Sequence, residues 1–350
     1  MRTSIFGSTI CSYCRVPFAT LLLAGYTFGL PLDAAALAVT RGPYLQLGTQ
    51  SSIVVRWRTD AATDSRVRYG TSPTELRNVV DDAAITTEHV VKLTGLNPAT
   101  QYYYSVGNST ATLAGDDGKH VFVTAPTPGT EQPTHIWIVG DSGTAKSNAR
   151  AVRDAYLNYK GSRNTHLWLM LGDNAYVDGT DSEYQAALFD MYPTLLRQTV
   201  LWPTLGDRDG HMADSGSQSG PYYDIFTLPK QGEAGGVASG TEAYYSFDYA
   251  NIHFVVLDSV ETSRAPTGAM LTWLKNDLAA TTQPWVIAYW HYPPYSKGLH
   301  DFNSEIRLGE MRQNVLPILE EAGVDLVLSG HSASYERSFL IDGHYGTFST

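Results

Sequence analysis

The sequence predicts a two-domain protein in which an N-terminal all-β sandwich precedes an α/β domain with mixed sheets flanked by helices. Short alternating segments separated by turn signals fill residues 41–125, which is typical of an antiparallel sandwich. Residues 126–133 are rich in Pro, Gly and Thr and indicate a linker. Residues 134–350 alternate apolar strands with helices, as βαβ units do. With 350 residues, each domain has enough chain for its own core.

The first 38 residues have the pattern of a secretory signal peptide. A positively charged start precedes an apolar run at 16–30, and small residues at 36–38 suit cleavage. The apolar run is shorter than the roughly 20 residues that cross a bilayer. Cys11 and Cys14 would leave with the signal, so the mature chain would have neither disulfides nor thiolate metal sites. We therefore expect a secreted or periplasmic protein without a stable membrane anchor.

The composition is that of a folded protein with an acidic balance. Hydrophobic residues make up 43% and charged residues 17%, values that are ordinary for a globular chain and exclude a disordered one. The formal net charge of −11 argues against a nucleic-acid partner, which would require a basic face. The oligomeric state is left open by the sequence.

The N-terminal domain is predicted to hold a tryptophan, Trp57, in a core between short strands. Strands are expected at 52–58, 65–70, 88–93 and 101–106. The stretch Leu96-x-Pro98-x-Thr100-x-Tyr102 resembles the fibronectin type III pattern, in which the Tyr hydroxyl locks a corner. Three consecutive tyrosines at 102–104 would also suit a carbohydrate-binding surface, but strand alternation places at least one of them in the core.

Two strands that end in Gly-Asp organise the second domain. Residues 134–139 lead into Gly140-Asp141, and residues 166–171 lead into Gly172-Asp173. A helix at 147–160 joins the two strands into a βαβ unit. It carries four residues at helical spacing on one face, Ala151, Val152, Ala155 and Tyr156. Parallel strands place both carboxylates at one edge of the sheet, where they repel each other unless a cation or a proton lies between them, so we predict a metal site.

The rest of the chain continues the alternation, and three more strands end at polar residues. Helices are expected at 181–198, 270–280 and 305–322, and a hairpin at 242–247 and 252–257. The strand at 200–204 leads into Gly206-Asp207-Arg208-Asp209, the strand at 285–290 ends at His291, and the strand at 324–329 ends at Gly330-His331. Residues 338–343 are expected to begin a further strand. Since only seven residues follow, we expect a fragment with an incomplete C-terminus.

The order and spacing of these blocks resemble those of the purple acid phosphatases. The blocks are Gly140-Asp141-x-Gly143, Gly172-Asp173-x-x-Tyr176, Gly206-Asp207-Arg208-Asp209, Ala288-Tyr289-Trp290-His291 and Gly330-His331-Ser332-Ala333. These enzymes are calcineurin-like metallophosphoesterases, and their plant-type members carry a fibronectin-like N-terminal domain. The resemblance, over about residues 41–345, implies an α/β metallophosphoesterase sandwich and hydrolysis of phosphate monoesters.

The resemblance also implies two metal ions. The ligands of the first, normally Fe(III), would be Asp141, Tyr176 and a bridging Asp173. Those of the second, which would be Zn, Mn or Fe(II), would be His291, His331 and Asp207. Hard carboxylate and phenolate oxygens suit Fe(III), whereas imidazole nitrogens suit the divalent ions. Two such metals can deprotonate a water, clamp the phosphate and stabilise in-line displacement.

The chain departs from the family pattern at residues that matter for catalysis. The family has Asn-His where this chain has Asp207-Arg208; Arg208 can hold a phosphate bidentately but is a poor proton donor. Ala333 replaces the second His of Gly-His-x-His, a ligand of the first metal, and a methyl group cannot coordinate. His300, nine residues past His291, is expected to line the substrate pocket. Arg208 and His300 are therefore the predicted catalytic residues.

Two other functions are carried as alternatives. Ala333 and Arg208 would suit a catalytically weakened or metal-depleted family member that acts as a binding protein. A surface adhesin or glycan binder would use the β domain instead. Gly140-Asp141-Ser142-Gly143 also matches the tetrad around a trypsin-like nucleophile, but the βαβ context and the absence of disulfides argue against that fold.

Overall fold

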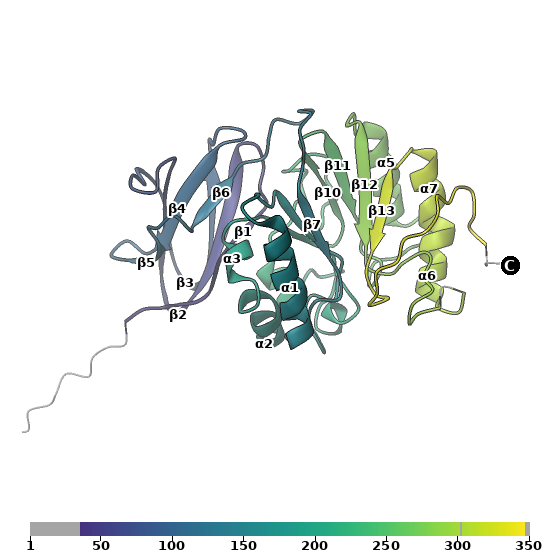
Figure 1. Cartoon of the computed structure of the whole chain (residues 1–350), viewed down its shortest axis with the longest axis horizontal. Helices are drawn as coiled ribbons and strands as arrows, with labels where there is room; N and C mark the ends of the chain where they lie inside the picture. The colour runs from purple at the N-terminus through teal and green to yellow at the C-terminus, as the bar shows by residue number, and fades with distance from the viewer. Residues whose placement is uncertain (1–35, 302, 347–350) are drawn as a thin grey trace, which may run out of the picture. The chain divides into compact units, whose positions relative to one another are not determined.

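The computed structural model describes residues 36–301 and 303–346. The predicted signal peptide lies outside the described residues except for 36–38, so it stays a prediction. The predicted order of an all-β region followed by α/β units is confirmed (Figure 1).

The β domain is one six-stranded antiparallel sheet system in which β2 and β4 are the central strands. Its strands are β1 (Val39–Gln46), β2 (Ser52–Gly70), β3 (Asn78–Thr94), β4 (Gln101–Gly107), β5 (Thr112–Gly115) and β6 (Val121–Val123). The two strands predicted at 52–58 and 65–70 are one strand, β2, because β3 pairs along both halves through two register shifts. Trp57 is 1% exposed and stacks on His89. The hydroxyl of Tyr102 accepts a hydrogen bond from the Asn97 amide at 3.0 Å, which fixes the predicted corner.

The described residues of the α/β domain form two sheets. Strands β7 (Ile136–Val139), β8 (Leu167–Met170) and β9 (Leu201–Pro203) form a parallel sheet. Strands β10 (Tyr245–Tyr249), β11 (Ile252–Val256), β12 (Trp285–Trp290) and β13 (Leu326–Ser329) form a mixed sheet that begins with the predicted hairpin. The helices are α1 (Ser147–Lys160), α2 (Asp181–Tyr184), η1 (Gln185–Phe189), α3 (Pro193–Leu196), η2 (Asp209–His211), α4 (Pro221–Ile225), α5 (Ala269–Ala280), α6 (Ile306–Glu310), η3 (Met311–Val315) and α7 (Leu316–Glu321). In Figure 1, α1 lies beside β7, and α5, α6 and α7 lie beside β12 and β13.

Aromatic side chains fill the space between the two sheets. Trp202 of β9 stacks on Phe247 of β10 with ring centroids 3.9 Å apart, and Phe247 stacks in turn on Phe254 of β11. The Tyr289 hydroxyl of β12 donates to the Trp202 carbonyl at 3.1 Å. All of these side chains are fully buried, and burying one large apolar side chain stabilises a fold by about 1.5–3 kcal/mol. This packing sets both sheets with the carboxyl ends of β7, β8, β9, β12 and β13 at a common edge.

The helix predicted at 147–160 is confirmed as α1, but of the four residues predicted on one face only Tyr156 lies inward, whereas Ala151, Val152 and Ala155 are exposed. Val152 is 54% exposed, and the inward residues are Ala149, Tyr156 and Leu157. Tyr156 stacks on Trp137 of β7 at 4.4 Å. Arg153 occupies an inward position because its guanidinium donates to the Met191 carbonyl at 2.5 Å, and a charged residue with a specific partner is invisible to a pattern of apolar spacing.

Two further predicted elements need correction. The helix at 181–198 is broken after η1 and restarts as α3, because Pro193 lacks the N–H that a continuous helix needs. Its predicted inward face, Tyr184, Ala187, Leu188 and Met191, is buried as expected. The strand expected at 338–343 does not form: these residues have no regular structure, and Phe339 and Leu340 are almost fully exposed.

Hydrogen bonds join the β domain to the α/β domain. Asp181, at the start of α2, accepts from Arg41 of β1 at 2.8 Å and from Arg58 of β2 at 2.7 Å. The bond from Arg58 is the main reason that the pKa of Asp181 is lowered. The Tyr44 hydroxyl donates to the Ile225 carbonyl at 2.8 Å.

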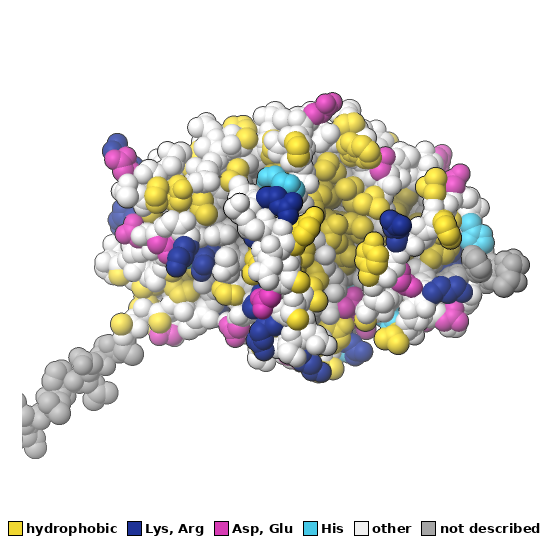
Figure 2. Space-filling view, viewed as in Figure 1, with side chains coloured by type: hydrophobic (Ala, Val, Ile, Leu, Met, Phe, Trp, Pro, Cys, Tyr) yellow, Lys and Arg dark blue, Asp and Glu magenta, His cyan; other side chains and the backbone are white. Residues whose placement is uncertain are grey.

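On the face shown in Figure 2, the charged side chains are interspersed, with Lys and Arg among Asp and Glu.

A buried imidazole, His253 of β11, lies between two carboxylates in the α/β domain. Its Nδ1 is 2.7 Å from Asp248 Oδ1 and its Nε2 is 2.9 Å from Asp277 Oδ2. The His253 side chain is 1% exposed and that of Asp277 is fully buried. Burial alone would lower the pKa of His253, but the two carboxylates raise it to about 9. Both nitrogens therefore donate, and the group is an imidazolium at neutral pH.

The substitution His253→Gln is expected to destabilise the protein by about 3–5 kcal/mol at pH 6, because it leaves buried carboxylates without their counter-charge. Since the folded pKa is raised, the stabilisation is fully present below pH 6.5 and is lost as the pH rises through about 9. Urea unfolding of both proteins at pH 6 and at pH 10 measures this. The gap in free energy of unfolding should shrink at pH 10, and an equal gap at both pH values would contradict the assignment.

Candidate metal centre

Five strands deliver the predicted ligands to one edge of the α/β domain. Asp141 follows β7, Asp173 follows β8, and Asp207 lies in the loop after β9. His291 follows β12 directly, and His331 lies two residues after β13. The parallel pairing of β7, β8 and β9, and of β12 with β13, brings these chain ends together, as the βαβ topology predicted.

Asp207, His291 and His331 form one compact group. The Nε2 of His291 lies 2.9 Å from Asp207 Oδ1, and the Nδ1 of His331 lies 3.2 Å from the same oxygen. Ligand atoms bound at about 2.0–2.2 Å from one ion lie roughly 3 Å from one another, so these separations suit a shared cation. The Nδ1 of His291 donates to the Leu171 carbonyl at 2.9 Å, so Nε2 is the nitrogen that faces the group and would coordinate a cation that displaces its proton.

Asp141, Asp173 and His291 form a second group that shares the imidazole of the first. Ligand atoms of these three residues all lie within 4.8 Å of one another, and Asp173 Oδ1 is 3.4 Å from His291 Nε2. Asp173 is 3% exposed, and its 3.4 Å distance to His291 places this buried carboxylate next to the imidazole that the two groups share. Tyr176 reaches the same place, since its hydroxyl lies 3.4 Å from Asp141 Oδ1.

Gly206 lets the loop after β9 pack directly against Asp173. A Cβ at Gly206 would lie 1.9 Å from the Asp173 amide nitrogen and 2.4 Å from Asp173 Oδ1, so no other residue fits. Asp141 and Asp173 both have a φ of 55°, the left-handed region that L-residues other than Asn, Asp and His seldom adopt. At Gly172-Asp173 the edge geometry requires both residues of the pair, since Gly172 has a φ of 86° and a Cβ there would lie 2.6 Å from His291 Nδ1.

The electrostatics of the site favour a cation. Burial would lower the pKa of His291, yet Asp207, Asp173 and Asp141 raise it to about 9. Burial also raises the pKa of Asp141, and burial together with Asp173 and Asp141 raises that of Tyr176. The bonds from His291 and His331 outweigh burial and lower the pKa of Asp207. Oxygen and imidazole donors in a strongly negative pocket fit the iron, zinc or manganese ions that the sequence suggested.

The two predicted catalytic residues lie at the edge of this site. The Arg208 amide donates to Asp173 Oδ1 at 3.0 Å, and its half-exposed guanidinium lies 5.9 Å from the Tyr176 ring centroid. His300 lies over His331, with ring centroids 3.7 Å apart. Ala333 is exposed and has a φ of 51°, in the turn whose His331 amide donates to Asp141 Oδ2 at 2.8 Å.

The sequence marked Asp209 only as the last residue of the block Gly206-Asp207-Arg208-Asp209, and the structure places its carboxylate at the centre of a hydrogen-bond network. Its fully buried carboxylate accepts from the amides of Asn174, Ala175 and Gly206 and from the Tyr184 hydroxyl at 2.6 Å. Burial raises its pKa to about 7, with a further contribution from Asp173. Asp209 thus ties the loop that carries Asp173 to the loop that carries Asp207. The sequence signal for this role was the position of Asp209 two residues after the predicted ligand Asp207.

Glu305 is a neighbour of the site that the sequence did not reveal. Its carboxylate contacts His300 and His331, although it was assigned only to the start of a helix. No Gly-rich strand end or family block marks Glu305 in the sequence.

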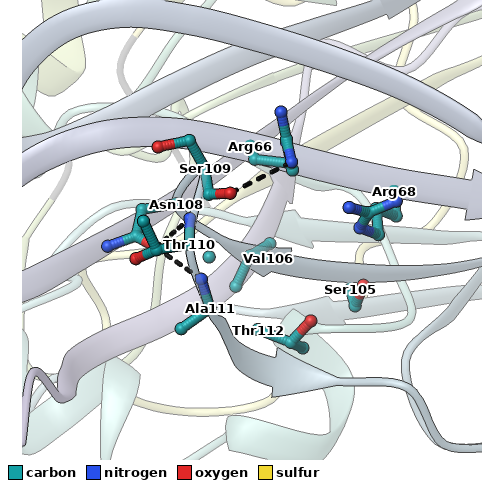
Figure 3. Close-up of a pocket in the computed structure, with 10 residues that line it drawn as sticks. Arg66, Arg68, Ser105, Val106, Asn108, Ser109, Thr110, Ala111 and Thr112 are labelled. Carbon is teal, nitrogen blue, oxygen red and sulfur yellow. Dashed lines mark hydrogen bonds between the residues drawn. The ribbon is translucent and has the colours of Figure 1, made fainter.

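A separate polar pocket of about 110 Å³ lies in the β domain (Figure 3). It is lined by Arg66 and Arg68 of β2, by β4, and by the loop to β5. It is thus remote in the chain from the strand ends described above.

Of the three consecutive tyrosines, Tyr102 and Tyr104 are buried in the core, which leaves only Tyr103 half-buried for a glycan surface.

None of the helices that the described residues form has the length and apolar character needed to cross a membrane.

Comparisons with known proteins agree with the arrangement of the chain. Residues 40–124 match the family "Purple acid Phosphatase, N-terminal domain", and residues 134–335 match "Calcineurin-like phosphoesterase". Purple acid phosphatase 15 of Arabidopsis thaliana is 28% identical over 277 residues, which is 71% of this chain and 49% of that protein. Purple acid phosphatase of Glycine max is 26% identical over 342 residues, 89% of this chain and 70% of that protein. The chain thus spans about half the length of some of these relatives.

A solved structure titled "Structure of PhoD" shares the fold. It superposes with a TM-score of 0.59 at 15% identity, covering 83% of this chain and 70% of that one. The match to the phosphoesterase family extends over more than half of the chain. The matched residues, 134–335, include all six candidate metal ligands. The chain therefore belongs to the calcineurin-like phosphoesterase family, preceded by a purple acid phosphatase N-terminal domain.

Proposed function

We propose that this chain is a metal-dependent phosphatase that hydrolyses phosphate monoesters at the edge formed by β7, β8, β9, β12 and β13. The observation that carries the proposal is the pair of donor groups that meet at Asp173 and His291. The purple acid phosphatases among the relatives support a phosphate ester as the substrate. A phosphate ester is small and doubly charged, and two cations in a negative pocket would reverse the local charge that otherwise repels it.

Two metal ions would be held by six residues of this chain. Asp141, Asp173 and Tyr176 would hold the first, which we expect to be Fe(III), and Asp207, His291 and His331, with Asp173 shared, would hold Zn, Mn or Fe(II). When bound, such a pair supplies a nucleophile near neutral pH and neutralises phosphate oxygens. Gly206 and Asp209 keep the two carboxylate loops in contact, so the donors are positioned before the substrate arrives.

Arg208 and His300 would act on the substrate. The Arg208 guanidinium is 40% exposed and loosely paired, with its Nε 3.7 Å from Asp207 Oδ2, so it is free to turn toward a phosphate oxygen. It would bind and orient the phosphate rather than donate a proton, because a guanidinium keeps its proton and offers a planar pair of N–H donors to the phosphate oxygens. His300 would line the other wall of the pocket above His331.

We propose the remaining organisation on the sequence pattern: a signal peptide at 1–38, a β domain at 41–125, a linker at 126–133 and a phosphoesterase domain from 134. The mature protein would then be secreted or periplasmic and begin near Val39. N-terminal sequencing of protein recovered from the extracellular or periplasmic fraction tests this. A chain that retains Met1, or that occurs in the cytosol alone, would refute it.

Hydrolysis of p-nitrophenyl phosphate tests the proposed activity. Protein stripped of metal with a chelator should be inactive, and addition of iron with zinc or manganese should restore turnover. The reason is that the bound metals, and not the ligand side chains, would activate the attacking water. Restored turnover should require two ions per chain. A metal-loaded protein that binds phosphate without turning over any ester would instead establish the weakened, binding-protein alternative, for which Ala333 and Arg208 are the specific residues.

A further inference from the structure

We propose that Glu305 is a positioning residue that sets the orientation of His331 and His300 with its two carboxylate oxygens. This rests on the proposed function in so far as His331 is a metal ligand. Oε2 of Glu305 lies 3.3 Å from His331 Nε2, and Oε1 lies 2.8 Å from His300 Nδ1. One carboxylate therefore joins an imidazole of the candidate metal group to the imidazole that lines the pocket.

The two ring nitrogens of His331 have different partners, Asp207 for Nδ1 and Glu305 for Nε2. Its Nδ1 lies 3.2 Å from Asp207 Oδ1, on the side of the candidate second metal. A metal ligand must present a lone pair, so the proton of the neutral ring must sit on Nε2. Glu305 is the acceptor that Nε2–H meets. A carboxylate at this position favours the required tautomer and increases the basicity of the coordinating nitrogen.

Packing leaves His331 little freedom to turn away from this arrangement. The side chain is 8% exposed. The Tyr292 ring meets it edge-on with centroids 4.5 Å apart, and His300 covers it at 3.7 Å. The main-chain amide of His331 is fixed on Asp141. Glu305 completes this set at the one ring nitrogen that neither Asp207 nor the metal would occupy.

The same carboxylate fixes His300. Its Nδ1 donates to Glu305 Oε1, so the neutral ring carries its lone pair on Nε2. The His300 side chain is 34% exposed, so this orientation is imposed by Glu305 more than by burial. Glu305 thereby links the pocket wall to the metal group.

A third cation held by His300, Glu305 and His331 is the competing interpretation, since their ligand atoms also lie within 4.8 Å of one another. The ring geometry disfavours it. The rings of His300 and His331 overlap at 3.7 Å with an interplanar angle of 33°. Imidazole lone pairs lie in the ring plane, so two overlapping rings direct them side by side rather than at a common ion.

Zinc-loaded full-length protein tests the proposal with three variants. Glu305→Ala removes both acceptors, Glu305→Gln keeps one neutral acceptor, and Glu321→Ala alters an exposed carboxylate at the end of α7 as the control. Competition with a chromophoric chelator gives the zinc affinity, and long-range ¹H–¹⁵N NMR of the imidazoles reports whether the His331 proton sits on Nε2. Circular dichroism confirms folding.

Glu305→Ala should weaken the more tightly held zinc by about 10–100-fold, the effect typical of outer partners of metal-bound histidine, and should abolish the ordered Nε2–H signal of His331. Glu305→Gln should fall between Glu305→Ala and the wild type, and Glu321→Ala should match the wild type. Equal affinity and an unchanged His331 signal in Glu305→Ala would overturn the proposal, as would the loss of a whole third ion. If the wild type held no zinc, the proposed function would fail, and the His331 tautomer alone would still decide the role of Glu305.

Discussion

Replacement of Asp173 by alanine is expected to abolish phosphate ester hydrolysis and to remove both metal ions. Asp173 is the proposed bridging ligand: its Oδ1 lies 3.4 Å from Nε2 of His291, the imidazole common to the two donor groups, and accepts the Arg208 amide at 3.0 Å. A carboxylate that would bind both ions leaves each of them one ligand short when it is removed. The loss of turnover should therefore exceed the roughly 100-fold that marks the upper range for outer partners of a metal site.

The matched control is Asp178→Ala, five residues along the same loop. Asp178 has a 58% exposed side chain that pairs with His211 at 3.1 Å, and an exposed ion pair contributes about 0–1 kcal/mol. Asp178→Ala should keep its metal content and turnover within about twofold of the wild type. Steady-state hydrolysis and elemental analysis of the same samples measure both quantities. Asp173→Ala protein that retained two ions and wild-type turnover would remove Asp173 from the site.

The substitution Ala333→His is expected to act in the opposite direction and to strengthen the first metal site. The resemblance places a histidine ligand at this position, and Asp141, Asp173 and Tyr176 would otherwise share the ion with water. The turn that carries Ala333 is bound to Asp141 through the His331 amide, so residue 333 is two residues from a direct contact with the first group. Ala333 has a φ of 51°, a conformation in which histidine is one of the better tolerated residues.

With iron supplied, Ala333→His should raise occupancy of the first site, give a visible phenolate-to-iron absorption band through Tyr176, and increase turnover. Loss of a direct ligand costs more than the 10–100-fold of an outer partner, so the gain in iron affinity should be at least about 10-fold. Ser334→His, at the exposed neighbouring position, is the control and should change none of the three. If Ala333→His likewise changed neither iron content, colour nor rate, residue 333 would not face the metals.

The sequence predicted the convergence of Asp141 and Asp173 because a topological rule governs it: parallel strands joined by a helix end at the same edge. It predicted the order of domains and most strands for a different reason, since alternation and turn residues are local signals. Side-chain roles were harder. Arg153 lies inward on α1 through one hydrogen bond to a distant carbonyl, and apolar spacing carries no trace of such a bond.

The break near Pro193 could have been predicted, because a proline inside a helical pattern removes a backbone hydrogen bond. The regular apolar face at 184–191 led to the prediction of a continuous helix instead. Glu305 was beyond reach for a different reason. Its contacts with His300 and His331 depend on where a loop returns to the sheet edge and on the side-chain rotamers there. Neither the spacing of residues nor the family blocks encodes that return.

Anomalous X-ray scattering from crystals of zinc-loaded protein tests the central claim most directly, because it locates the ions independently of activity. The account predicts a strong peak about 2.0–2.2 Å from the ligand atoms of Asp207, His291 and His331. A weaker peak is predicted beside Asp141, Asp173 and Tyr176, since that group lacks a histidine of its own. Peaks that are absent from this edge, or that lie only beside His300 and Glu305, would contradict the account.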